Sequence, residues 1–159
     1  MLQEQLPQIT IYTDGACLGN PGTGGYGTII ASGSSSTEIS GGYRLTTNNR
    51  MEMMAVIKGL ESLEAKSMIT ICSDSKYVID AIDKGWALRW KKNGWMRNKK
   101  EKAINPDLWE RLLELCSRHT ISFVWIKGHS GHIQNERCDQ LAVNAAKQLD
   151  LSQDLGYNR

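Results

Sequence analysis

The chain has no long apolar run, no paired-cysteine motif and no segment that resembles a secretory signal. No stretch approaches the roughly 20 consecutive apolar residues that cross a bilayer, so the sequence predicts no membrane span. The segment MLQEQLPQ lacks the basic start and apolar run of a signal peptide, and we therefore expect a cytoplasmic protein. The cysteines show neither CxxC nor Cys/His ligand spacing, which favours reduced thiols; they are Cys17, Cys72, Cys116 and Cys138.

Length and charge place the chain among globular proteins with one unusual segment. At 159 residues it is long enough for one well-buried core, and we expect a single domain over residues 1–159 with a loose tail at 151–159. Residues 84–102 hold eight Lys or Arg against one Glu, a local net charge of +7, so the remaining residues sum to −5. Such a segment favours a polyanionic partner, although a solvated face is the alternative.

Hydrophobic periodicity predicts an α/β domain. Strand-like alternation or clustering of apolar residues occurs at 8–15, 25–32, 37–47, 67–74 and 120–128. Helical spacing occurs at 48–63, at 74–82 with Asp74 or Ser75 as cap, in part of the basic segment, at 105–119 and at 136–149. The resulting order βββαβα(α)αβα predicts a mixed five-stranded sheet flanked by helices.

Carboxylates occur in unusual places in this pattern. Asp14 and Asp74 each end a predicted strand directly after a hydroxyl residue. If the two strands are parallel neighbours, both acids lie at the carboxyl ends of the sheet, where open α/β sheets bind ligands. Glu52 and Asp139 begin the apolar stripes of two predicted helices, where a carboxylate is costly unless it is paired, hydrogen-bonded or bound to a metal. Singly, each acid is typical of a turn, a cap or a first helical turn. Together, with no matching inward Lys or Arg, they predict an all-oxygen site suited to Mg²⁺ or Mn²⁺.

Longer motifs surround these acids. They are TDGACLGNPGTGGYG around Asp14, TTNNRMEMMA around Glu52, SDSKYV around Asp74, and VWIKGHSGHIQNERCDQLA, which contains His129 and Asp139. With the tryptophan-rich basic segment, they resemble type 1 ribonuclease H in its bacterial form, in the family's order and over nearly the whole chain. The resemblance implies the ribonuclease H-like fold, endonucleolytic hydrolysis of the RNA strand of RNA–DNA hybrids, and a monomer. It leaves protein partners open.

The resemblance also implies catalytic roles. The acids at 14, 52, 74 and 139 match the family's metal-binding residues, which would hold two Mg²⁺ ions with the substrate, Mn²⁺ being a substitute. The expected products carry 5′-phosphate and 3′-hydroxyl ends. His129 matches the family's histidine that assists proton transfer or product departure, whereas His132 has no such match and is expected to be a surface or loop-packing residue. Glu136 matches an acid near one metal in some members and is equally typical of a first helical turn.

Substrate contacts are implied in the same way. Lysines and arginines of segment 84–102, Lys91 and Lys92 among them, would neutralise phosphates, and Trp86 and Trp90 would offer flat faces to sugars or bases. Trp95 and Trp109 are assigned to the core instead. Amide side chains suit 2′-hydroxyls because they both donate and accept, and turn or cap chemistry is the alternative, above all for Asn48. The family positions at the minor groove or a backbone phosphate are Cys17, Asn20, Thr47, Asn48 and Asn49.

Two features and two other functions remain open in the sequence. Lys76 stands where many bacterial relatives carry Gln, and this cation could reach a phosphate or face water. The segment GNPGTGGYG lacks the Lys–Ser/Thr ending of a nucleotide-binding loop, so it predicts turn chemistry and disfavours ATP or GTP binding. One alternative function is a DNA-directed exonuclease or junction resolvase of the same broad fold. The other is a catalytically silent hybrid-binding module that uses the basic segment alone.

Overall fold

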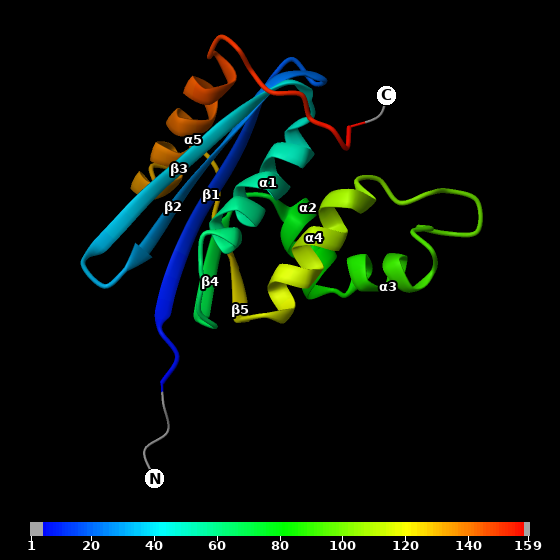
Figure 1. Ribbon diagram of the computed structural model, residues 1–159, viewed down its shortest axis with the longest axis horizontal. Coiled ribbons are helices and arrows are strands. Elements are labelled where there is room, and N and C mark those ends of the chain that lie inside the picture. Colours follow the sequence, from blue (N-terminus) through cyan, green and yellow to red (C-terminus); the bar gives the residue numbers. More distant parts are fainter. Residues whose placement is uncertain (1–4, 158–159) are drawn as a thin grey trace.

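A computed structural model describes residues 5–157 and places their strands in one mixed sheet with helices on both faces (Figure 1). The strands are β1 (Gln8–Leu18), β2 (Gly22–Ser32), β3 (Ser35–Thr46), β4 (Met68–Ser73) and β5 (Thr120–Trp125). The helices are α1 (Asn48–Glu61), α2 (Lys76–Asp83), α3 (Trp86–Lys92), α4 (Pro106–Ser117) and α5 (Ile133–Ala146). The predicted order and the five-stranded sheet are confirmed. Within residues 5–157, no helix combines the length and apolar character that a bilayer crossing requires.

The order of strands across the sheet is β3-β2-β1-β4-β5. The hairpin-connected strands β1, β2 and β3 pair antiparallel, whereas β4 pairs parallel with both β1 and β5. Tyr12 lies opposite Cys72 in the β1–β4 register, so these two strands run side by side to the same edge. Asp14 and Asp74 each lie two residues beyond this last pair and are therefore neighbours. The prediction that the first strand ends at Asp14 is wrong, because β1 stays paired with β2 as far as Leu18.

The core lies between the sheet and the helices α1 and α4. The predicted stripe of α1 is confirmed, since Met53, Val56, Ile57 and Leu60 are all buried. Trp109 of α4 is fully buried, as assigned from the sequence, and Trp95 packs against the core while only half-buried. On the opposite face of the sheet, α5 covers β1, β2 and β3 (Figure 1).

The expectation of a loose tail is wrong for residues 151–157. Asp154 is 6% exposed and accepts hydrogen bonds from Thr46 Oγ1 at 2.7 Å and from Arg50 Nε at 2.7 Å. The N–H of Arg44 donates to the backbone oxygen of Ser152 at 2.9 Å, which ties the tail to β3 as well. Residues 158–159 lie outside the part of the chain that the structure describes.

Arg50 also corrects the expectation that no basic side chain points inward. This first-turn residue of α1 is 1% exposed and pairs with both Asp154 and Asp107 at 2.7 Å. The charge of its guanidinium is neutralised by these two acids, on the side of α1 that faces both the tail and α4. The buried arginine therefore joins three distant segments of the chain and belongs to the scaffold.

Candidate functional site

The parallel strands β1 and β4 place two carboxylates next to each other, Asp14 inside β1 and Asp74 directly after β4. Asp14 is 4% exposed, and its Oδ1 accepts a hydrogen bond from the N–H of Gly15 at 3.0 Å. Asp74 is half-buried in the turn between β4 and α2. That turn is fixed because Ser73 Oγ accepts from the Ser75 N–H at 3.0 Å and Ser75 Oγ caps α2. Ser75, rather than Asp74, is thus the cap, which leaves the Asp74 carboxylate available.

Glu52 reaches these two acids because Gly15 has no side chain. A Cβ at Gly15 would overlap the backbone nitrogen of Glu52 and lie 2.6 Å from the carbonyl carbon of Met51. The close approach of α1 to β1 brings one carboxylate oxygen from each of Asp14, Glu52 and Asp74 within 4.8 Å of the others. We call these three residues the acidic cluster. Glu52 is only 5% exposed, and its Oε2 is buried without a hydrogen-bond partner.

Substituting Gly15 by Ala tests this packing. We expect the free energy of unfolding to fall by about 1–3 kcal/mol, because the new methyl meets backbone atoms of α1 that cannot rotate away. We also expect weaker binding of divalent ions, since the start of α1 carries Glu52. Denaturant titration and ion-dependent melting measure the two effects.

Gly59→Ala is the matched control, because its new methyl meets only side-chain methyl groups of Thr28 and Ile11 at 3.0 and 3.1 Å. Ala is also about 1 kcal/mol more favourable than Gly inside a helix, so the free energy of unfolding of this variant should stay close to that of the parent protein. Equal stability of the Gly15 and Gly59 variants would contradict the role given to Gly15.

The fourth predicted acid, Asp139, comes from α5 on the other face of the sheet. A Cβ at Gly27 of β2 would overlap the carbonyl oxygen of Cys138, so this glycine lets α5 lie directly on β2. Asp139 is not among the three acids within 4.8 Å, yet its charge raises the pKa values of both Asp14 and Asp74. The structure therefore brings oxygens of three acids within 4.8 Å of one another, and the fourth acid is near enough for its charge to act on two of them.

The segment GNPGTGGYG is a turn only in its first residues. β2 begins at Gly22, earlier than the predicted start at residue 25, and Gly25 and Gly27 lie inside it. At Gly25 a Cβ would overlap the carbonyl oxygen of Ala142, as at Gly27 with Cys138. These two glycines therefore allow α5 to pack closely on β2, which alternation of apolar residues does not reveal.

The acidic cluster is strained electrostatically as long as no cation shares it. Burial, followed by the charge of Asp74, raises the pKa of Asp14 to about 7. Burial and the charge of Asp14 also raise the pKa of Glu52 well above its ordinary value, and burial raises that of Asp74. Buried like charges and an unpartnered carboxylate oxygen are the conditions that a hard divalent cation relieves, so the donor set fits Mg²⁺ or Mn²⁺.

The loop before α5 lies against the cluster. A Cβ at Gly128 would lie 2.5 Å from Asp74 Oδ2, so the loop backbone passes close to this carboxylate. The next residue, His129, is exposed and has a φ of 55°, and its charge lowers the pKa of Asp74. His129 is thus beside the acids on the solvent side.

His132 caps α5, its Nδ1 accepting from Asn135 N–H at 3.2 Å, so the helix starts at Ile133, earlier than predicted. Glu136 is exposed in the first turn of α5.

The expected minor-groove residues gather around the β1–β2 turn and the start of α1. Asn20 Oδ1 accepts a hydrogen bond from the Asn48 N–H at 3.1 Å, which joins the two segments. Thr47 Oγ1 accepts from the N–H of Arg50 at 3.3 Å and is the cap of α1, so the alternative of Asn48 as cap is wrong. Cys17 Sγ lies 2.7 Å from a carbonyl oxygen of the turn. The last of these residues, Asn49, is exposed.

The basic segment forms α3 and the loop after it, which project from the body of the molecule (Figure 1). Trp86 is 37% exposed, whereas Trp90 packs edge-on against Trp109, with ring centroids 6.1 Å apart. Both tryptophans line a hollow of about 440 Å³ together with Arg89 and Arg97. Lys91 and Lys92 are exposed. Trp86 therefore presents an open face, and Trp90 combines a core contact with the hollow.

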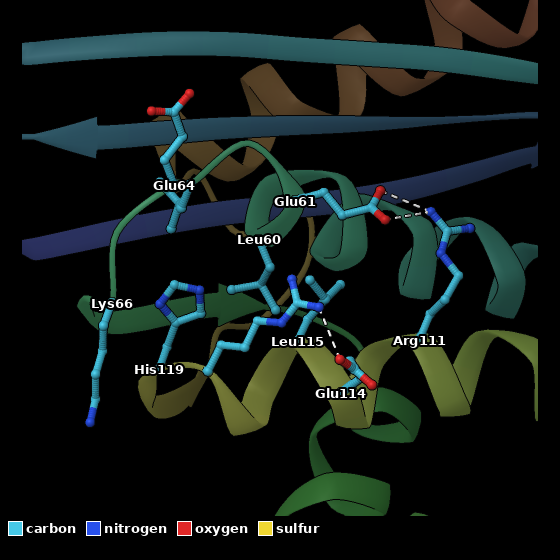
Figure 2. A pocket seen from close by; sticks show the side chains of 10 residues that line it. Leu60, Glu61, Glu64, Lys66, Arg111, Glu114, Leu115 and His119 are labelled. Atoms are coloured by element: carbon cyan, nitrogen blue, oxygen red, sulfur yellow. Dashed lines mark hydrogen bonds and ion pairs between the residues drawn. The ribbon is translucent and has the colours of Figure 1, made fainter.

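A separate hollow of about 410 Å³ lies between the ends of α1 and α4 (Figure 2). Two of its acids are paired with cations, since Glu61 accepts from Arg111 at 2.8 Å and Glu114 accepts from Arg118 at 2.9 Å, and its third acid, Glu64, is exposed to solvent. None of the four predicted acids lines it. Carboxylates that are buried and lie close together occur instead in the acidic cluster, which is therefore the better candidate for chemistry.

Similarity to known proteins is extensive. A family model described as RNase H matches residues 7–147. The chain is 63% identical over 156 residues to the Ribonuclease H of Trichodesmium erythraeum, covering 98% of this chain and 99% of that protein. It is 51% identical over 152 residues to the Ribonuclease HI of Synechocystis sp., covering 95% of each.

Solved structures share the architecture. LC9-RNase H1, described as a type 1 RNase H with the type 2 active-site motif, has a TM-score of 0.80 at 29% identity and covers 91% of this chain and 74% of its own. LC11-RNase H1, solved in complex with an RNA/DNA hybrid, has a TM-score of 0.67 at 24% identity, covering 87% of this chain and 96% of its own. The comparison with LC11-RNase H1 therefore shows that the two proteins share a fold.

Proposed function

The chain belongs to the ribonuclease H family and hydrolyses the RNA strand of RNA–DNA hybrids, and we propose that the acidic cluster and Asp139 carry this reaction by holding divalent ions. The observation that supports this role is the buried Glu52 Oε2, which lacks a hydrogen-bond partner and lies among carboxylates within 4.8 Å. A divalent cation would supply the missing partner of this oxygen and neutralise the neighbouring carboxylates together.

The acidic cluster and Asp139 would hold two Mg²⁺ ions, or Mn²⁺ as a substitute, and ions bound there would activate a water and stabilise the leaving oxygen. The chain's residues orient this chemistry. Asp14 and Glu52 are held rigidly by the β1–α1 contact, Asp74 by the α2 cap, and Asp139 by the α5–β2 contact. The products are 5′-phosphate and 3′-hydroxyl ends. His129, exposed beside Asp74, moves a proton at the leaving oxygen or helps the product depart.

The substrate is held on two sides of the cluster. Asn20, Asn48 and Asn49, with Cys17 and Thr47, face the minor groove, where amides can both donate to and accept from 2′-hydroxyls. The basic segment binds phosphates through Lys91 and Lys92, and the Trp86 and Trp90 hollow receives sugars or bases. Affinity then falls as salt rises, because each phosphate contact releases counterions.

We expect cleavage of the RNA strand of a labelled hybrid in Mg²⁺ and none in chelator. An RNA duplex and a DNA duplex, assayed beside it, should remain intact. Cleavage of all-DNA strands would favour the exonuclease or resolvase alternative, and hybrid binding without cleavage in excess Mg²⁺ would favour the silent binding module.

We further propose a single catalytic domain that acts as a cytoplasmic monomer. One sheet contains all the strands of residues 5–157, the family model spans 7–147, and all the proposed metal-binding residues come from one chain. The cysteines are free thiols, which a reducing compartment preserves. Sedimentation at micromolar concentration measures the oligomeric state.

A further inference from the structure

An exposed tryptophan at the end of β5 is tied to the backbone of a cluster residue. Trp125, the last residue of β5, is 46% exposed, and its Nε1 donates a hydrogen bond to the backbone oxygen of Asp74 at 3.1 Å. This hydrogen bond fixes the indole beside the end of β4. An aromatic face thus stands open to solvent next to the acidic cluster.

Lys76 lies over this face. Its Nζ is 4.6 Å from the centroid of the Trp125 ring, within the range of a cation–π contact. The ring partly immobilises a side chain that otherwise has large rotamer freedom, and so lowers the entropy lost when its ammonium binds a ligand. The contact therefore presents a positive charge at a defined place, two residues from Asp74.

The position of Lys76 is not explained by the stability of its own helix. It is the first residue of α2, where the helix dipole disfavours a cation, and the first turn of α2 has no acidic residue. None of the ion pairs within 4.0 Å among residues 5–157 includes Lys76. The ammonium is therefore available to an external anion.

We propose that Lys76, held over the indole of Trp125, binds a phosphate of the RNA strand next to the phosphate that is cleaved. This inference rests on the proposed function, because the acidic cluster locates the reacting phosphate. Successive phosphates of a strand recur about every 3.4 Å along the helix axis, so a neighbour of the reacting phosphate falls within reach of a lysine beside Asp74. An ammonium is a point charge that suits phosphate and carries no base specificity.

Lys76→Gln removes the charge while keeping a side chain of similar polarity. We expect KM for the hybrid to rise about 3–10-fold at low salt, with kcat within about twofold, because the contact is made in both ground and transition states. The slope of log(kcat/KM) against log salt should become shallower by about one. Lys66→Gln is the matched control, because this substitution removes the same charge. Lys66 is exposed and lies at the opposite end of β4 from Lys76 (Figure 2). Identical salt slopes for the two variants would overturn the proposal.

A hybrid series with one neutral methylphosphonate at each RNA position locates the contact. Binding is measured in chelator, so the result does not depend on cleavage. At one position near the cleavage site, the methylphosphonate should weaken binding by the parent protein and leave Lys76→Gln unaffected. Equal sensitivity of both proteins at every position would exclude the contact. If the parent protein left the RNA strand intact in Mg²⁺, the proposed function would fail, and the binding series would still decide the role of Lys76.

Discussion

Asp14→Asn is expected to lower kcat for hybrid cleavage by at least about 10³-fold, which corresponds to ~4 kcal/mol at the transition state. Asn keeps the size of the side chain and removes the charge that, with Glu52 and Asp74, would hold the divalent ions. Such ions contribute several kcal/mol of transition-state stabilisation. Single-turnover cleavage at saturating Mg²⁺ measures the loss. Added Mg²⁺ should also raise the melting temperature of the parent protein and have little effect on the variant.

The same substitution should leave the metal-free fold as stable as before, or more stable, and change its response to pH. Burial and the charge of Asp74 raise the pKa of Asp14 from 3.8 to about 7 in the folded protein. The folded state therefore binds this proton more tightly than the unfolded chain does. The resulting stabilisation is complete below about pH 4 and is lost as pH rises towards 7. In chelator, the melting temperature of the parent protein should fall across this range relative to that of Asp14→Asn.

Asp83→Asn is the control for these measurements, because Asp83 is an exposed acid at the end of α2. It should keep the kcat and the pH dependence of the parent protein. A clear drop in the metal-free melting temperature of Asp14→Asn would mean that the Asp14 carboxylate has a stabilising partner in the fold. Retained cleavage would show that the reaction does not need the acidic cluster.

The acidic cluster could be predicted from local patterns in the sequence, namely where strands and the apolar face of a helix place their acids. Two similar strand sequences, each with an acid after a hydroxyl residue, predicted that Asp14 and Asp74 are neighbours. The parallel β1–β4 pairing supplies the reason, although β1 continues beyond Asp14 to Leu18. The apolar stripe of α1 placed Glu52 inward because side chains three and four residues apart share a helix face. These inferences needed only periodicity and the direction of a strand.

The contacts that hold the cluster in place were not accessible in this way. The sequence does not predict that Gly27 makes room for α5, because a missing side chain has no periodicity of its own. It does not predict the inward position of Arg50 either, because the partners Asp107 and Asp154 are 57 and 104 residues away along the chain. Such contacts depend on tertiary packing, and only the assembled fold reveals them.

Arg50→Ala is expected to lower the free energy of unfolding by about 3–5 kcal/mol, because it leaves buried Asp154 without its cation. Arg50 Nε and Nη2 donate to Asp154 at 2.7 and 3.0 Å, and Nη1 and Nη2 donate to Asp107 at 2.9 and 2.7 Å. For a protein of this size, such a loss lowers the melting temperature by roughly 6–20 °C. Calorimetry and urea titration measure the change.

The exposed pair between Arg111 and Glu61 supplies the control, since its bidentate hydrogen bonds of 2.8 and 2.9 Å have similar geometry in solvent. Arg111→Ala should cost no more than about 1 kcal/mol. The double variant Arg50→Met with Asp154→Leu should regain much of the loss of Arg50→Ala, because it removes the unpaired buried charge together with its partner. If Arg50→Ala instead matched Arg111→Ala, burial would not be what makes this ion pair important, and residues 151–157 would need another anchor.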